Sequence, residues 1–335
     1  MSVSGASPIA HGGDLDAART LFPDAPAPWI DLSTGINPVP YPCPPLEASA
    51  FRRLPSPADL AALKAAAAQA YGVVDPAGIV AAPGTQILIE TLPRLVAQGR
   101  VAVVGPTYAE HAAAWARAGH AVAAVSDLDM SDLDVAADVV VVVNPNNPDG
   151  RSWDAASLLA CAARQHACGG LLVVDEAFAD LESLDSLGPR LRPGLVVLRS
   201  FGKTYGLAGL RLGFALTEPG LAARIAEALG PWAVSGPALA IGHAALSDAA
   251  WREAAALARD ADADRLDRLI ARAGGRVVGG TRLFRTADFP DGPGLFRRLG
   301  AAGIYVRRFA AAPSRLRFGL PADRTEWCRL SRVLK

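Results

Sequence analysis

Short apolar runs alternate with helix-forming segments between residues 79 and 216, and this alternation constrains the fold more than any other feature. The run 139–143 is five consecutive valines, which is typical of a strand covered on both faces. Such alternation predicts an α/β fold with a mostly parallel central sheet sandwiched by helices, whose ligands bind beyond the carboxyl ends of the strands. The predicted strands are 79–82, 101–104, 121–125, 139–143, 171–174, 195–198 and 212–216, and the predicted helices are 58–71, 85–95, 109–118 and 155–165.

The segments on either side of this core have a different character. Residues 1–30 are rich in Pro, Gly and Ala and predict an N-terminal arm with one short helix at 15–21. Residues 31–57 carry many prolines and predict an extended loop at the start of a large domain, 31–220. Residues 221–335 predict a smaller α+β C-terminal domain that the arm completes. Its predicted helices are 221–229 and 249–273, and its predicted strands are 276–278, 283–286, 304–306 and 316–318.

Composition excludes several classes of function. The 335 residues carry no net charge, and no basic stripe indicates a nucleic-acid partner. Every apolar run is too short to span a membrane, and the N-terminus lacks the pattern of a signal peptide. The four cysteines lie far apart without metal-ligand spacing, so we expect reduced thiols, no metal site and a cytoplasmic protein.

The segment from Ser200 to Arg211 contains the strongest chemical signal. Lys203 follows a predicted strand on a glycine-flanked turn, from which its amine can point into a pocket, as an imine-forming lysine requires. Ser200 and Arg211 are spaced to hold an anion beside it. A surface lysine in a glycine-rich loop is the plain alternative, and for this segment alone it would be preferred.

Four further motifs follow upstream strands. Gly84-Thr85-Gln86 begins a helix, whose free N–H groups suit a phosphate, although an ordinary N-cap is an equal explanation. Pro106-Thr107-Tyr108 places an aromatic ring after strand 101–104. The turn 144–150, Asn-Pro-Asn-Asn-Pro-Asp-Gly, follows the valine strand, and Asp175 with Phe178 follows strand 171–174.

Together these motifs resemble the pyridoxal-phosphate enzymes of fold type I, the aminotransferase superfamily. The resemblance implies that Lys203 holds the cofactor as an imine and that Asp175 keeps the pyridine nitrogen protonated. It implies that Tyr108 stacks on the ring and that Asn147 bonds the ring oxygen. These four residues are the predicted catalytic set. The implied phosphate cup comprises Gly84, Thr85, Gln86, Ser200 and Arg211.

Two positions depart from the family pattern. Phe178 stands where relatives often have a tyrosine that bonds the ring oxygen, so Asn147 is left as the predicted partner. Leu54 stands where relatives have the tyrosine of a Tyr-Pro-x-Pro segment, whose hydroxyl reaches the cofactor phosphate of the partner subunit. The implied homodimer therefore lacks that contact.

Four arginines near the C-terminus are candidates for the anionic ends of a substrate. The segment 315–319, Arg-Leu-Arg-Phe-Gly, resembles the family segment whose arginine binds the α-carboxylate, with Arg317 at the matching position and Arg315 as a weaker candidate. Arg307 and Arg308 end another predicted strand. We expect at least one of the four to be ordinary solvated surface.

The resemblance to the histidinol-phosphate aminotransferase branch covers roughly residues 30–320. His11-Gly12-Gly13 and the later segment ending in Ile36-Asn37-Pro38 resemble instead the threonine-phosphate decarboxylases of cobalamin biosynthesis. They imply conversion of L-threonine O-3-phosphate to (R)-1-amino-2-propanol O-2-phosphate, with His11, Asn37, Arg307 and Arg317 binding this small phosphorylated amino acid. A histidinol-phosphate or related aminotransferase remains the alternative, and a non-catalytic pyridoxal-phosphate regulator is a third.

Overall fold

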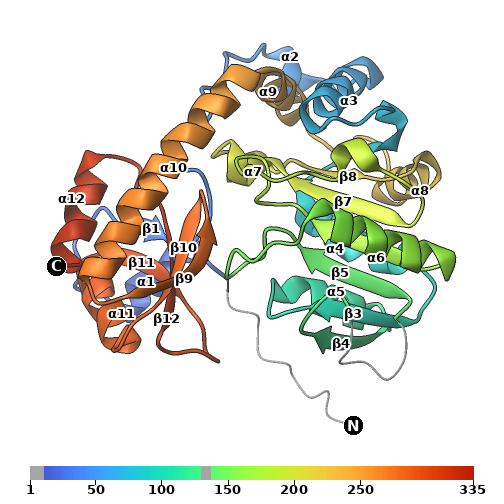
Figure 1. The fold of residues 1–335 in the computed structure, drawn as a ribbon. Helices are drawn as coiled ribbons and strands as arrows, with labels where there is room; N and C mark the ends of the chain where they lie inside the picture. Colours follow the sequence, from blue (N-terminus) through green and yellow to red (C-terminus); the bar gives the residue numbers. More distant parts are fainter. Residues whose placement is uncertain (1–10, 130–136) are drawn as a thin grey trace, which may run out of the picture.

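A computed structural model describes residues 11–129 and 137–335, which form two sheets (Figure 1). The larger, seven-stranded sheet has the order β2-β8-β7-β6-β5-β3-β4. The five strands from β7 to β4 are parallel to one another, and β8 and β2 are antiparallel to their neighbours. The predicted mostly parallel sheet is therefore confirmed. The strands are β2 (Ile79–Ala82), β3 (Arg100–Val104), β4 (Ala121–Val125), β5 (Val139–Val143), β6 (Leu171–Asp175), β7 (Leu195–Ser200) and β8 (Gly213–Leu216).

Helices cover both faces of this sheet, which explains the uninterrupted valines of β5. Val139 and Val141 pack in a core with α4 (Thr85–Leu95), α5 (Ala109–Arg117) and α8 (Pro219–Leu229). Val140 and Val142 pack on the opposite face, in a core with α3 (Pro57–Tyr71), α6 (Ala155–Ala167) and α9 (Gly236–Ser247). Side chains of a strand alternate between the two faces, so a strand buried on both sides needs apolar residues throughout.

The smaller, five-stranded sheet has the order β1-β11-β12-β10-β9. Its strands are β1 (Ile30–Leu32), β9 (Arg276–Thr281), β10 (Phe284–Asp288), β11 (Ile304–Arg308) and β12 (Arg315–Gly319). The N-terminal segment contributes to it, because β1 pairs in parallel with β11 and Ile30 lies opposite Ile304. The helices that accompany the small sheet are α1 (Leu15–Leu21), α11 (Gly292–Ala301) and α12 (Arg324–Val333). The long helix α10 (Ala249–Arg272) extends from beside α9 to the small sheet (Figure 1).

Several elements differ from the sequence-based expectation. The predicted extended loop 31–57 contains most of β1 and the short helix α2 (Ser49–Arg52), and helices α9, α11 and α12 were not predicted. Both α9 and α11 begin with a glycine and a proline, which argue against a helix by propensity. Each nevertheless starts from a side-chain cap, Ser235 Oγ at 3.4 Å from the Ala238 amide and Asp291 Oδ1 at 2.7 Å from the Gly294 amide.

The packing bears on the proposed division into domains at residues 30/31 and 220/221. Strand β1 belongs to the small sheet although it lies almost wholly within the range 31–220. Helix α9 and most of helix α8, which belong to the range 221–335, pack on the large sheet and its helices. Among the helices of the described residues, none is long and apolar enough to cross a membrane.

Candidate active site

A cavity of about 370 Å³ lies where β5, β6 and β7 end and the small sheet faces them. It includes Val143 of β5, Asp175 of β6 and Ser200 of β7, each the last residue of its strand. The edge of the sheet predicted to bind a ligand is therefore the edge that carries the cavity. The nine predicted cofactor residues all line it, namely Gly84, Thr85, Gln86, Tyr108, Asn147, Asp175, Ser200, Lys203 and Arg211.

Lys203 lies on the single helical turn α7 (Phe201–Thr204), directly after β7. Its Nζ donates a hydrogen bond to Ser200 Oγ at 3.2 Å and stands 5.1 Å from the centre of the Phe178 ring. Burial lowers the pKa of Lys203; the charge of Asp175 opposes this, and the charges of Arg317 and Arg211 add to it. The lowered pKa makes the nucleophilic neutral amine easier to form than it is for an exposed lysine.

Asp175 ends β6 and is 4% exposed. Burial would raise its pKa, but hydrogen bonding and charge from His111, the charge of Lys203 and the amide of Ala177 outweigh burial and lower it. His111 Nε2 lies 2.9 Å from Asp175 Oδ2, and the Ala177 amide donates to Oδ1 at 3.0 Å. Asp175 is thus a carboxylate held charged in an enclosed site.

The sequence-based prediction missed His111, which is 1% exposed. Tyr108 is the N-cap of α5 and His111 stands three residues later, on the same side of the helix. Their ring centroids are 6.1 Å apart. The available signal was this spacing, a histidine one turn after the aromatic residue that begins the helix.

The N-terminus of α4 and Arg211 form a cup for an anion. Gly84 is the N-cap of α4 with φ of 84°, and a Cβ there would come within 2.7 Å of Arg211 Nη2. The loop therefore packs directly on the guanidinium. Arg211 itself adopts a left-handed conformation, φ 54°, which a non-glycine residue seldom takes. Within residues 11–129 and 137–335, no carboxylate forms an ion pair with Arg211.

Gln86 and Tyr108 contact each other at the wall of the cavity. The Tyr108 hydroxyl donates to Gln86 Oε1 at 3.1 Å. Burial, together with the charges of Glu110 and Asp175, raises the pKa of Tyr108 to about 12. The ring therefore remains a neutral phenol, positioned by its own hydrogen bond.

Arg317 lies on β12, is 7% exposed and reaches the cavity from the small sheet. It donates to Asn147 Oδ1 and, at 2.8 Å, to the carbonyl of Ser33, while its Nε has no hydrogen-bond partner in the described structure. Burial and the charge of Arg307 lower the pKa of Arg317 to about 10, against the charge of Asp31. No carboxylate of the described residues pairs with it. A buried cation without a counter-ion suits an anionic ligand.

The other three candidate arginines have different surroundings. Arg315 forms a two-point ion pair with Asp288 at 2.8 and 3.0 Å, and Arg308 stacks at 4.1 Å over the ring of Phe296. Arg307 lies opposite Arg317 in the register of β11 and β12. It lines a neighbouring hollow of about 650 Å³ rather than the cavity itself, and His11 borders both spaces.

The two predicted substrate residues from the N-terminal segment differ in their placement. His11 lines the cavity, and its Nε2 lies 3.0 Å from Glu110 Oε1. Asn37 does not line it, because its side chain is buried in hydrogen bonds to Thr204 and Arg259. Its placement therefore does not support a contact with substrate. Leu54 is exposed on the surface.

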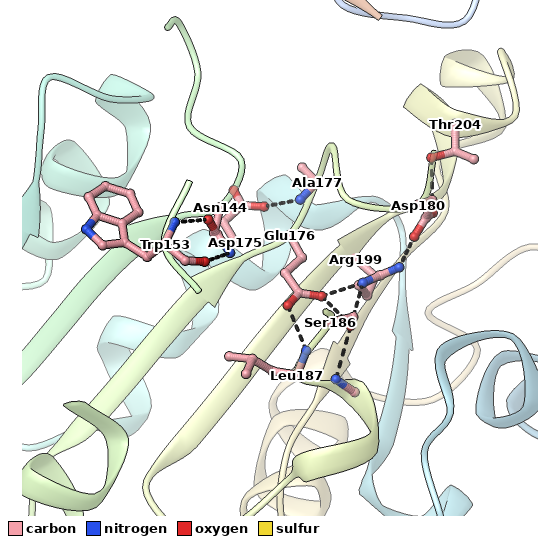
Figure 2. A network of polar contacts seen from close by, with 11 residues as sticks. Asn144, Trp153, Asp175, Glu176, Ala177, Asp180, Ser186, Leu187, Arg199 and Thr204 are labelled. Atoms are coloured by element: carbon pink, nitrogen blue, oxygen red, sulfur yellow. Dashed lines mark hydrogen bonds and ion pairs between the residues drawn. The ribbon is translucent and has the colours of Figure 1, made fainter. Parts of the chain in front are cut away.

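A second buried network, also missed from sequence, holds the lysine turn in place (Figure 2). Arg199 of β7 pairs with Glu176 and Asp180, both buried. Asp180 Oδ2 accepts from Thr204 Oγ1 at 3.0 Å. Because Thr204 follows Lys203, the network fixes the turn relative to the loop after β6.

Comparisons with known proteins agree with this geometry. Two relatives called threonine-phosphate decarboxylase, from Pseudomonas aeruginosa and a Sinorhizobium species, are 43% and 46% identical over 97% and 98% of both chains. A solved L-threonine-O-3-phosphate decarboxylase of Porphyromonas gingivalis superposes with a TM-score of 0.72 at 21% identity, covering 86% of this chain and 94% of that one. A histidinol-phosphate aminotransferase of Sinorhizobium meliloti, solved with pyridoxal-5'-phosphate, gives 0.79 at 23% identity, covering 98% and 94%. The model of aminotransferase class I and II matches residues 28–327, and the chain belongs to that family.

Proposed function

We propose that this protein is a pyridoxal-phosphate-dependent decarboxylase that converts L-threonine O-3-phosphate to (R)-1-amino-2-propanol O-2-phosphate and carbon dioxide, a step of cobalamin biosynthesis. The observation that carries the proposal is one cavity in which Lys203 and Asp175 lie together with Arg317, a buried cation without a carboxylate partner. The names of the relatives at 43% and 46% identity support the same reaction.

The residues present fit the cofactor. The N-terminus of α4 and Arg211 offer N–H groups and positive charge to its phosphate, and Asp175 offers a fixed negative charge to its pyridinium. Asn147 accepts from Arg317 through Oδ1, which leaves its Nδ2 as a donor toward the ring oxygen. Bound here, pyridoxal phosphate supplies an electron sink for a carbanion at the substrate Cα.

The chain's own residues then select the bond that breaks. Arg317 binds the α-carboxylate, and His11 and Arg307, which border the neighbouring hollow, bind the substrate phosphate. Holding both ends would fix the orientation of the substrate at Cα, so that the Cα–carboxylate bond is the one whose electrons the bound cofactor would accept. Lys203 Nζ takes up the proton that the substrate ammonium group gives up on binding, and after carbon dioxide leaves it delivers this proton to Cα.

Carbon dioxide release without a 2-oxoacid is the direct test. The purified protein, loaded with pyridoxal phosphate, is incubated with L-threonine O-3-phosphate alone, with the Lys203→Ala variant as control. A histidinol-phosphate or related aminotransferase, the second candidate, would need a 2-oxoacid and release no carbon dioxide. Binding of the cofactor with no turnover of either kind would favour a regulator instead.

The same proposal includes a cytoplasmic homodimer. Reduced thiols are compatible with a cytoplasmic location, since the cysteines of the described residues form no disulfide. Phe51, Leu54 and Trp232 are large apolar side chains that are each more than half exposed, which favours self-association. Light scattering at the assay concentration measures the mass, and a fully active monomer would contradict the dimer.

A further inference from the structure

The helical turn that carries Lys203 is too short to satisfy its own carbonyl groups. A helix leaves its last four carbonyls without partners inside the helix, and α7 has only four residues. The chain just beyond it satisfies the first two: the amide of Tyr205 donates to Phe201 at 3.1 Å, and the amide of Leu207 donates to Gly202 at 3.1 Å. The carbonyls of Lys203, Thr204 and Tyr205 need partners from elsewhere.

Those partners come from residues 37–41, which lie more than 160 positions earlier in the chain. The Asn37 amide donates to the carbonyl of Lys203 at 2.8 Å, and Asn37 Nδ2 donates to that of Thr204 at 2.9 Å. The Tyr41 amide donates to the carbonyl of Tyr205 at 2.9 Å. The segment therefore caps three consecutive carbonyls of the lysine turn, and Asn37 provides two of the caps.

Arg259 of α10 fixes the orientation of this asparagine. Its Nη1 donates to Asn37 Oδ1 at 2.9 Å, and its Nη2 pairs with Asp262 at 2.7 Å. The amide of Val39 also donates to Oδ1, at 3.1 Å, so this contact and that of Arg259 together define which end of the amide faces Thr204 and leave Nδ2 to donate. Asn37 and Arg259 are both buried, at 2% and 8% exposed. Through Asn37, α10 is thus connected to the lysine turn.

We infer that Asn37, oriented by Arg259, is a positioning residue for Lys203: it caps the lysine turn and thereby sets the direction of Nζ in the cavity. This positioning role takes the place of the substrate contact that the sequence predicted for Asn37. The inference rests on the proposed function, since it assigns Lys203 to the bound pyridoxal phosphate. It adds a requirement that the cofactor motifs do not contain, an asparagine from the N-terminal segment and an arginine from the long helix.

The test compares Asn37→Ala with Thr217→Val. The Thr217 hydroxyl is buried and donates to the carbonyl of Leu195 at 2.8 Å, at the end of β7 far from Lys203. Both variants remove a buried side-chain hydrogen bond to a backbone carbonyl. Measurements are Tm, kcat and KM for threonine phosphate, and the pH midpoint of the visible absorbance of the bound cofactor. Asp175, Arg211 and Arg317, the charged groups that act on Lys203, are unchanged in both.

We expect both variants to lower Tm, but only Asn37→Ala to shift the pH midpoint and to lower kcat, by about tenfold or more, because a small misplacement of a reacting group is costly. KM should change less than kcat. An unshifted midpoint with normal kcat in Asn37→Ala, or equal changes in the Thr217→Val variant, would overturn the inference. If Asn37→Ala does not fold, Arg259→Lys replaces it. We expect this variant to change kcat and the pH midpoint in the same direction but by less. If it changes neither, the inference is contradicted. A wild-type protein without visible absorbance would refute the proposed function instead.

Discussion

Replacing Arg317 by methionine should damage activity while leaving stability almost unchanged. A charge-assisted hydrogen bond contributes roughly 1.5–3 kcal/mol, so losing two bonds to the substrate carboxylate should remove about 3 kcal/mol or more, a fall of ~100-fold or more in kcat/KM. Cofactor binding should persist, because Arg317 does not belong to the phosphate cup. The assay is carbon dioxide release at several concentrations of threonine phosphate.

The stability half of this prediction follows from the buried charge. The pKa of Arg317 is lowered from its ordinary value to about 10, and the folded state therefore holds the proton less tightly than the unfolded state. At ~1.4 kcal/mol per pKa unit the cation costs roughly 3 kcal/mol. The cost is present in full below about pH 10 and decreases as the pH rises above it. Methionine removes it but leaves Asn147 Oδ1 and the Ser33 carbonyl without a donor, at about 1–3 kcal/mol each, so the two effects nearly cancel.

Arg315→Met is the matched control, because Arg315 lies on the same strand and pairs with Asp288 rather than lining the cavity. It should change kcat/KM by less than about twofold, as expected for loss of a partly exposed ion pair. A large fall in Tm for Arg317→Met with kcat/KM preserved would refute the reasoning, since Arg317 would then be a structural group with Asn147 and Ser33 as its true partners.

Three further substitutions test the other roles. Lys203→Ala should abolish both turnover and the visible absorbance of the bound cofactor, and a variant that keeps either would disprove its assignment. Asp175→Asn should still bind the cofactor but lose most activity, because the neutral amide no longer holds the pyridine nitrogen protonated; near-normal turnover would remove Asp175 from that role. His11→Ala should lower kcat/KM for threonine phosphate about ten- to a hundredfold, from loss of roughly 1.5–3 kcal/mol, without changing cofactor affinity. If kcat/KM is unchanged, His11 contacts only Glu110 and the argument for the decarboxylase weakens.

The sequence predicted the large sheet well because burial on both faces leaves an unambiguous pattern. The valines of β5 have only one environment open to them, and the neighbouring strands β6 and β7 end in the polar residues Asp175 and Ser200 at the cavity. Helices α11 and α12 and strand β1 carry weaker local signals. The three residues of β1 acquire their structure by pairing with β11, more than 270 positions later, which no local pattern encodes.

The site shows the same division. Cofactor residues that directly follow strands were predicted, because the end of a strand fixes their position in space. Asn37 was predicted to contact the substrate, whereas its side chain contacts Thr204 and Arg259. The sequence could not indicate these partners because they come from distant segments. The network of Arg199 with Glu176 and Asp180 was missed because an arginine within an apolar strand gives no indication of its partners.

The arrangement of charge around the cavity bears on the choice between the two reactions. In the proposed function Arg317 binds a carboxylate, and Arg307, opposite Arg317 in the register of β11 and β12, lines the neighbouring hollow that His11 also borders. Histidinol phosphate has a phosphate but no carboxylate, so an aminotransferase would use Arg317 only for its 2-oxoacid or amino-acid partner. Threonine phosphate carries both groups and can occupy both regions at once. Such a two-point contact fixes the rotation about the bond between Cα and the amino nitrogen of a single substrate. In the proposed function, that rotation makes the Cα–carboxylate bond the one that breaks.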